Sequence, residues 1–479
     1  MSEHLIKFRE ENLNSISKSF CAAKWYNASL HLGHGYTNSC HLPLPHPIDL
    51  EEIKTNPSAL HNTKFKKEIR KMMLEGVRPA ECSYCWKVED VGRNNVSDRI
   101  FKSIIYPKDD IAKLKNIPWD TDVNLKTVEV SFDRTCNFAC SYCNSGYSTT
   151  WGKDIKENGP YQKFKSVSAG AYHSDGSWSE VFGKNGENNP YVQAFMEWWP
   201  ELSKSLHEVR ITGGEPSASF NFWNFMEVMK QNPSPNINVA VNSNLGVDKK
   251  LIDKLIKVTH EIDVKNFDFY TSNESFGPHS EYIRDGLKYD EWRNNVVRIV
   301  EEAKCRQLVI MMTINSLSLF SLTEFLDDMI SLKKKYGQYK VVVDLNILRW
   351  PAFMAPVVLP IDKKQYVHTK LKTWFDNKEN LSLLHEGEVA QIQRVIDYIE
   401  VVDKGHVATE NDMDKHFHDF KSFYEQYDKR RGKDFCKTFP ELADWYNSIE
   451  VDYNIPNVSI TDGKIINYEI GEYKLDKNE

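Results

Sequence analysis

The stretch KTVEVSFDRTCNFACSYCNSG, residues 126–146, decides how this sequence is interpreted. Residues 126–132 are rich in β-branched side chains and predict a buried strand. The loop that follows carries Cys136, Cys140 and Cys143 in a C-x3-C-x2-C arrangement. Three thiolates on one loop can bind three irons of a [4Fe–4S] cluster and leave the fourth iron without a protein ligand. The spacing, directly after a strand, favours such a cluster over a zinc ion with a distant fourth ligand and over cysteines packed as small apolar residues.

The chain around this loop alternates between short β-branched runs and longer stretches with apolar residues every three or four positions. The predicted strands are 126–132, 208–212, 237–243, 266–272, 308–314 and 341–348. Alternating strands and helices predict βα units on a parallel sheet, and six units fit a partial (β/α)6 barrel. Residues 146–198 interrupt the first unit with a segment rich in Gly, Asn, Ser and aromatic residues. This insertion is either part of an active site at the C-terminal end of the strand or a disordered loop.

The overall composition is that of a soluble globular protein with more than one core. The chain has 479 residues, of which 41% are hydrophobic and 27% charged, and no apolar run is long enough to cross a bilayer. Its first residues do not resemble a signal peptide, so a cytoplasmic location is expected. The net charge of −7 argues against a nucleic-acid partner. We expect a cysteine-rich domain over residues 1–120, the barrel over 121–355 and a helical extension over 356–479.

The segment CNFACSYC, with Tyr142 before the third cysteine, resembles the signature of the radical S-adenosylmethionine (SAM) superfamily. The resemblance implies that SAM chelates the open iron, that an electron from the cluster cleaves the sulfonium, and that a 5′-deoxyadenosyl radical abstracts hydrogen from a substrate. The second predicted strand ends in ITGGEP, with Gly213, Gly214 and Glu215 where the family binds SAM. Glycines let the backbone approach a ligand, and a carboxylate accepts hydrogen bonds from an ammonium group.

Further polar residues follow the later strands. The third strand ends in Asn242 and Ser243, the fourth ends in Ser272, and Arg284 lies a short distance beyond. The resemblance implies that such groups contact the ribose and the carboxylate of SAM, and an arginine suits a bidentate pair with that carboxylate. Each of them could equally be an ordinary surface residue.

Four more cysteines precede the barrel: Cys21, Cys40, Cys82 and Cys85. Gly35 lies at the turn of a predicted hairpin that brings distant cysteines together, and the C-x2-C pair lets two thiolates share one metal or cluster. The arrangement is similar to the twitch part of the SPASM motif, which implies an auxiliary [4Fe–4S] cluster with an electron-transfer or structural role. Those domains usually follow the barrel, whereas this one precedes it. A structural zinc site with four thiolates is the alternative.

The remaining cysteines, Cys305 and Cys436, are expected to be buried thiols. The sequence does not identify the substrate, because substrate contacts vary among proteins that share a fold. We expect a small-molecule or peptide substrate, an oxidation, a crosslink or a peptide modification as the reaction, and a flavodoxin or ferredoxin-type electron donor. The alternative is a non-catalytic iron–sulfur or zinc protein that carries electrons or binds a partner.

Overall fold

The computed structural model describes residues 2–92, 94–177, 188–403, 410–461 and 464–466. It has one large sheet, with the strand order β11-β10-β8-β7-β6-β4-β1-β2-β3. All six predicted strands are present, as β4 (Thr127–Ser131), β6 (Glu208–Thr212), β7 (Ser234–Asn242), β8 (Val264–Ser272), β10 (Cys305–Ile314) and β11 (Val341–Ile347). The pairs β4–β6, β6–β7 and β10–β11 are parallel. The prediction of an α/β fold with the six strands of a partial (β/α)6 barrel is confirmed.

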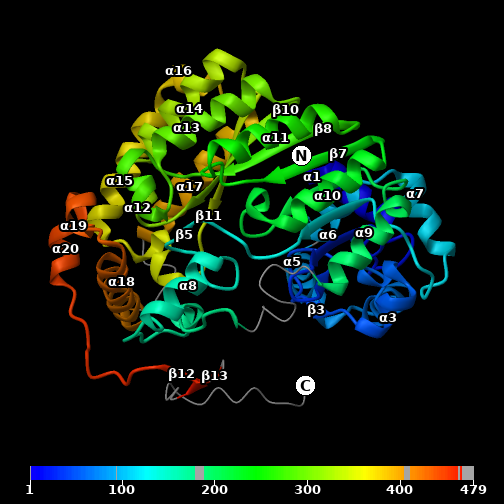
Figure 1. Ribbon diagram of the computed structural model, residues 1–479, viewed down its shortest axis with the longest axis horizontal. Helices are drawn as coiled ribbons and strands as arrows, with labels where there is room; N and C mark the ends of the chain where they lie inside the picture. Colours follow the sequence, from blue (N-terminus) through cyan, green and yellow to red (C-terminus); the bar gives the residue numbers. More distant parts are fainter. Residues whose placement is uncertain (1, 93, 178–187, 404–409, 462–463, 467–479) are drawn as a thin grey trace. The chain divides into compact units, whose positions relative to one another are not determined.

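Helices connect these strands, as the spacing of apolar residues predicts. They are α9 (Pro190–Leu202), α10 (Phe220–Gln231), α11 (Lys249–Glu261), α12 (Gly277–Ile283), α13 (Tyr289–Glu302) and α14 (Leu322–Tyr336). Helix α11 shows the rule: it buries Ile252, Leu255, Ile256 and Thr259 on one face and exposes its lysines on the other. Figure 1 shows α13 and α14 lying over β10 and β11, against which they pack.

The N-terminal segment adds strands to this sheet, which the sequence does not predict. Strand β1 (Asn27–His31) pairs in parallel with β4, and β2 (Tyr36–Asn38) and β3 (His46–Pro47) continue the sheet in antiparallel order. The predicted turn at Gly35 is present, and its φ of +74° requires glycine. The helices of this segment are α1 (Ser2–Phe8), α2 (Ala23–Tyr26), α3 (Leu50–Thr55), α4 (Lys64–Leu74), α5 (Ser83–Asp90), α6 (Asp98–Ile104) and α7 (Lys108–Lys113).

The chain forms two compact units. The first comprises residues 1–133, 180–241 and 261–267, and the second comprises residues 134–179, 242–260 and 268–479. Strand β8 begins in the first unit and ends in the second. The domain boundaries expected near residues 120 and 355 come from changes in the sequence pattern, namely where the alternation of strands and helices begins and ends. They stay predictions.

The second unit contains the insertion as far as residue 179, and the C-terminal helices. In its described part the insertion is structured, with α8 (Thr149–Asn158) and the 3-10 helix η5 (Val167–Tyr172), while residues 178–187 lie outside the described residues. The C-terminal elements are α15 (Ile361–Asp376), α16 (Lys378–Leu381), α17 (Glu386–Asp403), α18 (Glu410–Arg431), α19 (Phe435–Thr438), α20 (Ala443–Ser448), β12 (Ser459–Thr461) and β13 (Lys464–Ile466). The predicted helical character of this extension is confirmed up to residue 448.

Helix α17 covers the edge strand β11. The Glu388 carboxylate accepts hydrogen bonds from the Val343 N–H (2.7 Å) and from Lys333 Nζ (2.6 Å), and all three residues are buried. Gln391 Oε1 accepts from the Leu345 N–H (2.9 Å). Side chains of α17 therefore satisfy backbone N–H groups that an edge strand would otherwise leave without protein partners.

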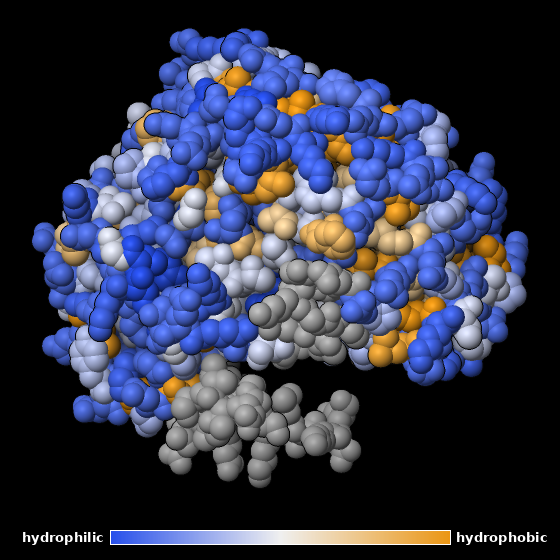
Figure 2. All heavy atoms as spheres, in the orientation of Figure 1, coloured by the Kyte–Doolittle hydropathy of each residue, from blue (hydrophilic) through white to orange (hydrophobic). Residues whose placement is uncertain are grey.

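In the described part of the chain, none of the helices is both long enough and apolar enough to span a membrane. The face of the molecule in Figure 2 is mostly hydrophilic, with hydrophobic side chains in small groups.

Candidate functional site

The three-cysteine loop lies directly after β4, and a short strand pair holds its middle. In this pair β5 (Ala139–Cys140) runs antiparallel to β9 (Arg284–Asp285), with Cys140 opposite Arg284. Cys140 is buried, whereas Cys136 and Cys143 are half-buried. The Phe138 N–H points at Cys136 Sγ (3.5 Å) and the Cys143 N–H donates to the Cys140 carbonyl (2.9 Å). The loop is therefore tightly turned, with its three thiols on one short segment.

A buried ion pair lies behind this loop. Arg284 donates from Nε (3.1 Å) and Nη2 (2.6 Å) to Glu274 Oε2, and the two side chains are 5% and 0% exposed. The Tyr142 hydroxyl also donates to Glu274 (3.1 Å), and Arg284 Nη1 lies 3.8 Å from Cys140 Sγ. Burial alone would lower the pKa of Arg284, but the Glu274 carboxylate raises it, so the guanidinium stays charged. The Glu274 carboxylate thus holds Arg284 and Tyr142, and Arg284 in turn lies beside Cys140. The sequence analysis does not single out Glu274.

This arrangement bears on the expected role of Arg284. Its guanidinium already holds one carboxylate, that of Glu274, and its Nη1 faces the sulfur of Cys140. A pair between Arg284 and the carboxylate of SAM stays a prediction.

Polar side chains meet at the C-terminal ends of the strands in the second unit. Asn242 ends β7, and Ser243 is buried with its Oγ accepting from the Leu245 N–H (3.1 Å). Ser272 ends β8 and is half-buried. Among the described residues, four buried polar atoms here have no hydrogen-bond partner: Asn242 Oδ1, Asn273 Nδ2, Ser275 Oγ and Ser316 Oγ. Unpaired buried donors and acceptors at these strand ends fit a polar ligand such as the ribose and amino-acid groups of SAM.

The GGEP turn lies in the first unit, after β6. Gly213 has φ +134°, and a Cβ there would lie 2.7 Å from the Asp133 carbonyl, so only glycine fits. The Gly214 N–H faces the same carbonyl at 3.4 Å. Glu215 is 1% exposed, and its Oε1 accepts from the Ser217 N–H (3.0 Å) and Oγ (2.6 Å). The glycines therefore serve the packing of two strand ends, while the contact of Glu215 with SAM stays a prediction.

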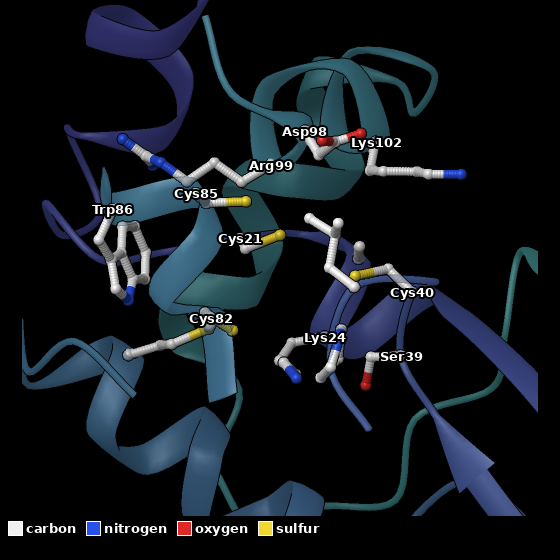
Figure 3. Close-up of a pocket in the computed structure, with 14 residues that line it drawn as sticks. Cys21, Lys24, Ser39, Cys40, Cys82, Cys85, Trp86, Asp98, Arg99 and Lys102 are labelled. Carbon is white, nitrogen blue, oxygen red and sulfur yellow. The ribbon is translucent and has the colours of Figure 1, made fainter. Parts of the chain in front are cut away.

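The four N-terminal cysteines line one pocket in the first unit. Figure 3 shows Cys21, Cys40, Cys82 and Cys85 around it, with their sulfur atoms turned toward the pocket. The surrounding segment has its own hydrophobic core, which includes the buried Trp25, Trp86 and Cys85 and packs against Cys21 and Cys82. The prediction that the hairpin and the C-x2-C pair bring these cysteines together agrees with this geometry.

A buried lysine lines the same pocket. Lys24 is 3% exposed and forms an ion pair with Glu81. Burial alone would lower the pKa of Lys24, but Cys82 and Glu81 raise it when they are ionised. Lys66 is 1% exposed and its Nζ donates to Thr37 Oγ1 (2.8 Å), but burial lowers its pKa well below the usual value. Lys24, rather than Lys66, therefore places a positive charge that favours negative charge on the cysteines.

The protonation of the thiols themselves is set by burial. Burial raises the pKa of Cys82 to about 12 and that of Cys85 to about 11, which favours the protonated thiol while no metal is bound. A metal would displace these protons on binding. All nine cysteines are free thiols; Cys305 is buried as expected, but Cys436 is only half-buried. Among the described residues, no group of three His, Cys, Asp or Glu side chains is arranged to hold a single metal ion.

The comparisons with known proteins give a distant likeness. No family model matches the chain, and no curated protein matches it. Among solved structures, SuiB from Streptococcus suis bound to S-adenosylmethionine is 13% identical, with a TM-score of 0.35 over 74% of this chain and 70% of that one. The structure of anSMEcpe with bound AdoMet and Kp18Cys peptide is 13% identical, with a TM-score of 0.31 over 53% of this chain and 61% of that one.

A third similar structure is TYW1 with a lysine–pyruvate adduct bound, which is 15% identical with a TM-score of 0.27 over 53% of this chain and 74% of that one. All three TM-scores are below 0.5, so these likenesses do not establish a common function. The functional proposal is therefore based on the chain's own residues.

Proposed function

We propose that this chain is a radical SAM enzyme whose catalytic [4Fe–4S] cluster is bound by Cys136, Cys140 and Cys143. The observation that carries the proposal is the position of these three thiols on one tight loop directly after β4 of the parallel sheet. Three protein thiolates leave one iron of the cluster open for SAM. When bound, the cluster supplies the electron that cleaves SAM, and the resulting 5′-deoxyadenosyl radical abstracts hydrogen from the substrate.

The chain's own residues have separate tasks in this proposal. Arg284 places a buried positive charge 3.8 Å from Cys140 Sγ, which favours the thiolate form of that ligand. Glu274 holds Arg284 in place through two hydrogen bonds. The unpaired polar atom of Asn242 at the end of β7 supports a contact with SAM, and we extend this role to Ser243 and Ser272. Glu215 is proposed to accept hydrogen bonds from the amino group of SAM.

We further propose that Cys21, Cys40, Cys82 and Cys85 bind an auxiliary [4Fe–4S] cluster. Each thiolate of such a cluster binds a different iron, whereas a zinc ion draws all four to about 2.3 Å from one point. The buried Lys24 beside the four cysteines supports an anionic group in the pocket. With four protein ligands this cluster would have no open iron, so its role would be electron transfer or structural.

The substrate is proposed only as a class, a small molecule or a peptide that loses a hydrogen atom, and the electron donor as a flavodoxin or ferredoxin. The second candidate function is an electron carrier without SAM chemistry. It is favoured by one observation, the pocket lined by four cysteines, because a cluster with four protein ligands would have no place for SAM.

One experiment separates the two functions. The protein is reconstituted anaerobically with iron and sulfide, reduced with dithionite and incubated with SAM, and 5′-deoxyadenosine is measured by chromatography. A radical SAM enzyme should form 5′-deoxyadenosine, and Cys140→Ala should abolish it because only this cluster can bind SAM. The matched control is Cys305→Ala, which removes a buried thiol outside both sites. If fully reconstituted wild type forms none with any candidate substrate, the electron-carrier function replaces the enzymatic one.

A further inference from the structure

The three-cysteine loop is bound to the protein by its backbone carbonyl groups. Five of these carbonyls each accept a hydrogen bond from a side chain, and the donor–acceptor pairs are Thr150 Oγ1 to Cys136 (2.7 Å), Ser148 Oγ to Phe138 (2.6 Å), Tyr427 Oη to Ala139 (3.4 Å), Trp151 Nε1 to Cys140 (2.9 Å) and Tyr172 Oη to Ser141 (2.7 Å). A loop with little regular structure must satisfy its backbone in this way. Here side-chain donors bind the carbonyl groups that a helix or a sheet would otherwise satisfy.

These donors come from two segments far apart in the sequence. Trp151 lies on α8 and Tyr172 ends η5, both in the insertion, while Tyr427 lies on α18 in the C-terminal extension. The rings pack in one cluster: the Trp151 and Tyr172 centroids are 5.3 Å apart, and Phe423 of α18 lies 4.8 Å from Tyr172. The insertion and the extension therefore form one aromatic body that supports the loop.

The same body also holds the strand that pairs with the loop. Arg431 stacks over the rings of Trp151 (4.7 Å) and Tyr427 (4.2 Å) and binds Asp285 Oδ2 through Nε (3.1 Å). Asp285 belongs to β9, which pairs with the loop at Ala139. Support thus reaches the loop from its carbonyl side and from its strand partner.

We propose that Trp151, Tyr172 and Tyr427 are positioning residues for the catalytic cluster. By binding three consecutive carbonyls they hold the loop in the shape that sets the three thiols around one cluster, and this inference rests on the proposed function. The insertion and the C-terminal extension then act on the chemistry without touching SAM. Tyr172 is the sharpest test, because its hydroxyl donates to a buried residue at 2.7 Å, whereas the Tyr427 hydroxyl is shared with the Tyr282 carbonyl.

The experiment compares Tyr172→Phe with the matched control Tyr282→Phe. Both tyrosines are buried in the same aromatic cluster, and each hydroxyl donates one short hydrogen bond, but that of Tyr282 (2.6 Å) goes to Asp428 of α18 rather than to the loop. Each reconstituted variant is reduced, and its electron paramagnetic resonance spectrum is recorded with and without SAM. The rate at which a chelator extracts iron and the thermal midpoint are measured in parallel.

Tyr172→Phe should lose iron about fivefold faster than Tyr282→Phe and show a weaker spectral change with SAM, at a similar thermal midpoint, because only its lost bond is to the loop. If Tyr172→Phe has no cooperative thermal transition, Tyr427→Phe takes its place in the same comparison. Equal iron loss and equal SAM response in the test and control variants would overturn the positioning role. If wild type itself shows no SAM-dependent spectral change, the proposed function fails instead, and the two failures are thereby distinguished.

Discussion

Replacing Glu274 with Gln should destabilise the second unit strongly. The change keeps the shape of the side chain but removes the negative charge that faces Arg284 at 2.6 Å, in a pair whose side chains are 5% and 0% exposed. Breaking a buried ion pair on one side costs about 3–5 kcal/mol, because the remaining charge stays buried without compensation. For a unit of this size the loss corresponds to a thermal midpoint lower by roughly 6 °C or more.

The measurement is thermal or urea unfolding of Glu274→Gln beside a matched control, Glu302→Gln. Glu302 also receives two hydrogen bonds from one arginine, Arg298 (2.8 and 2.9 Å), but its side chain is 46% exposed. Exposed pairs contribute at most about 1 kcal/mol, so the control should change little. A double variant, Glu274→Gln with Arg284→Met, removes the stranded cation as well and should be more stable than Glu274→Gln alone.

Two results would refute this reasoning. Equal loss of stability in Glu274→Gln and Glu302→Gln would mean that burial does not strengthen the inner pair. A double variant less stable than the single one would mean that Arg284 contributes through other contacts than its pair with Glu274.

Four further predictions concern other parts of the chain. Glu215→Ala should weaken SAM binding by about 1.5–3 kcal/mol in isothermal titration without loss of iron, and unchanged affinity would remove Glu215 from the site. Replacing Cys82 and Cys85 with Ala should lower the iron content from about eight to about four per chain while SAM cleavage persists; stoichiometric zinc in the wild type would contradict this. Lys24→Met removes a buried positive charge beside the four-cysteine pocket, so a redox titration should find a more negative reduction potential for the auxiliary cluster, and an unchanged potential would count against the charge effect. Burial lowers the pKa of His173 to about 4, so the folded chain binds fewer protons than the unfolded chain between pH 6.5 and 4. The unfolding free energy should therefore fall by about 2 kcal/mol between pH 7 and pH 5. In urea unfolding, His173→Gln should lose this part of the pH dependence, and an identical pH dependence in the variant and the wild type would refute it.

The sheet and its helices could be predicted from the sequence because their signals are local. In a strand such as 208–212 or a helix such as α11, apolar residues recur at a fixed period. The whole pattern that identifies the element is contained in about a dozen consecutive residues. The cysteine spacings are local in the same sense. Strand β1, with the short and mixed sequence NASLH, has no such signal, and its place beside β4 depends on pairing across about a hundred residues.

The supports of the site could not be predicted for a related reason. Glu274 lies in the polar run SNES, which is typical of a surface loop, and its burial depends on Arg284 ten residues later. Tyr427 lies on a predicted helix, but its partner is the carbonyl of Ala139, nearly three hundred residues earlier. Sequence patterns indicate which face of a helix is apolar but not which loop a single hydroxyl will reach.

The cover that α17 provides for β11 has a consequence for any shortened form of the protein. Glu388 and Gln391 occupy the N–H groups of Val343 and Leu345 with side chains, so no further strand can add at those positions. A chain cut after residue 355 would keep every strand of the large sheet but expose this row of N–H groups, together with the buried Lys333 left without its carboxylate. Such a fragment would pair edge to edge with other copies and precipitate, so the last quarter of the chain is a condition for keeping the sheet in solution.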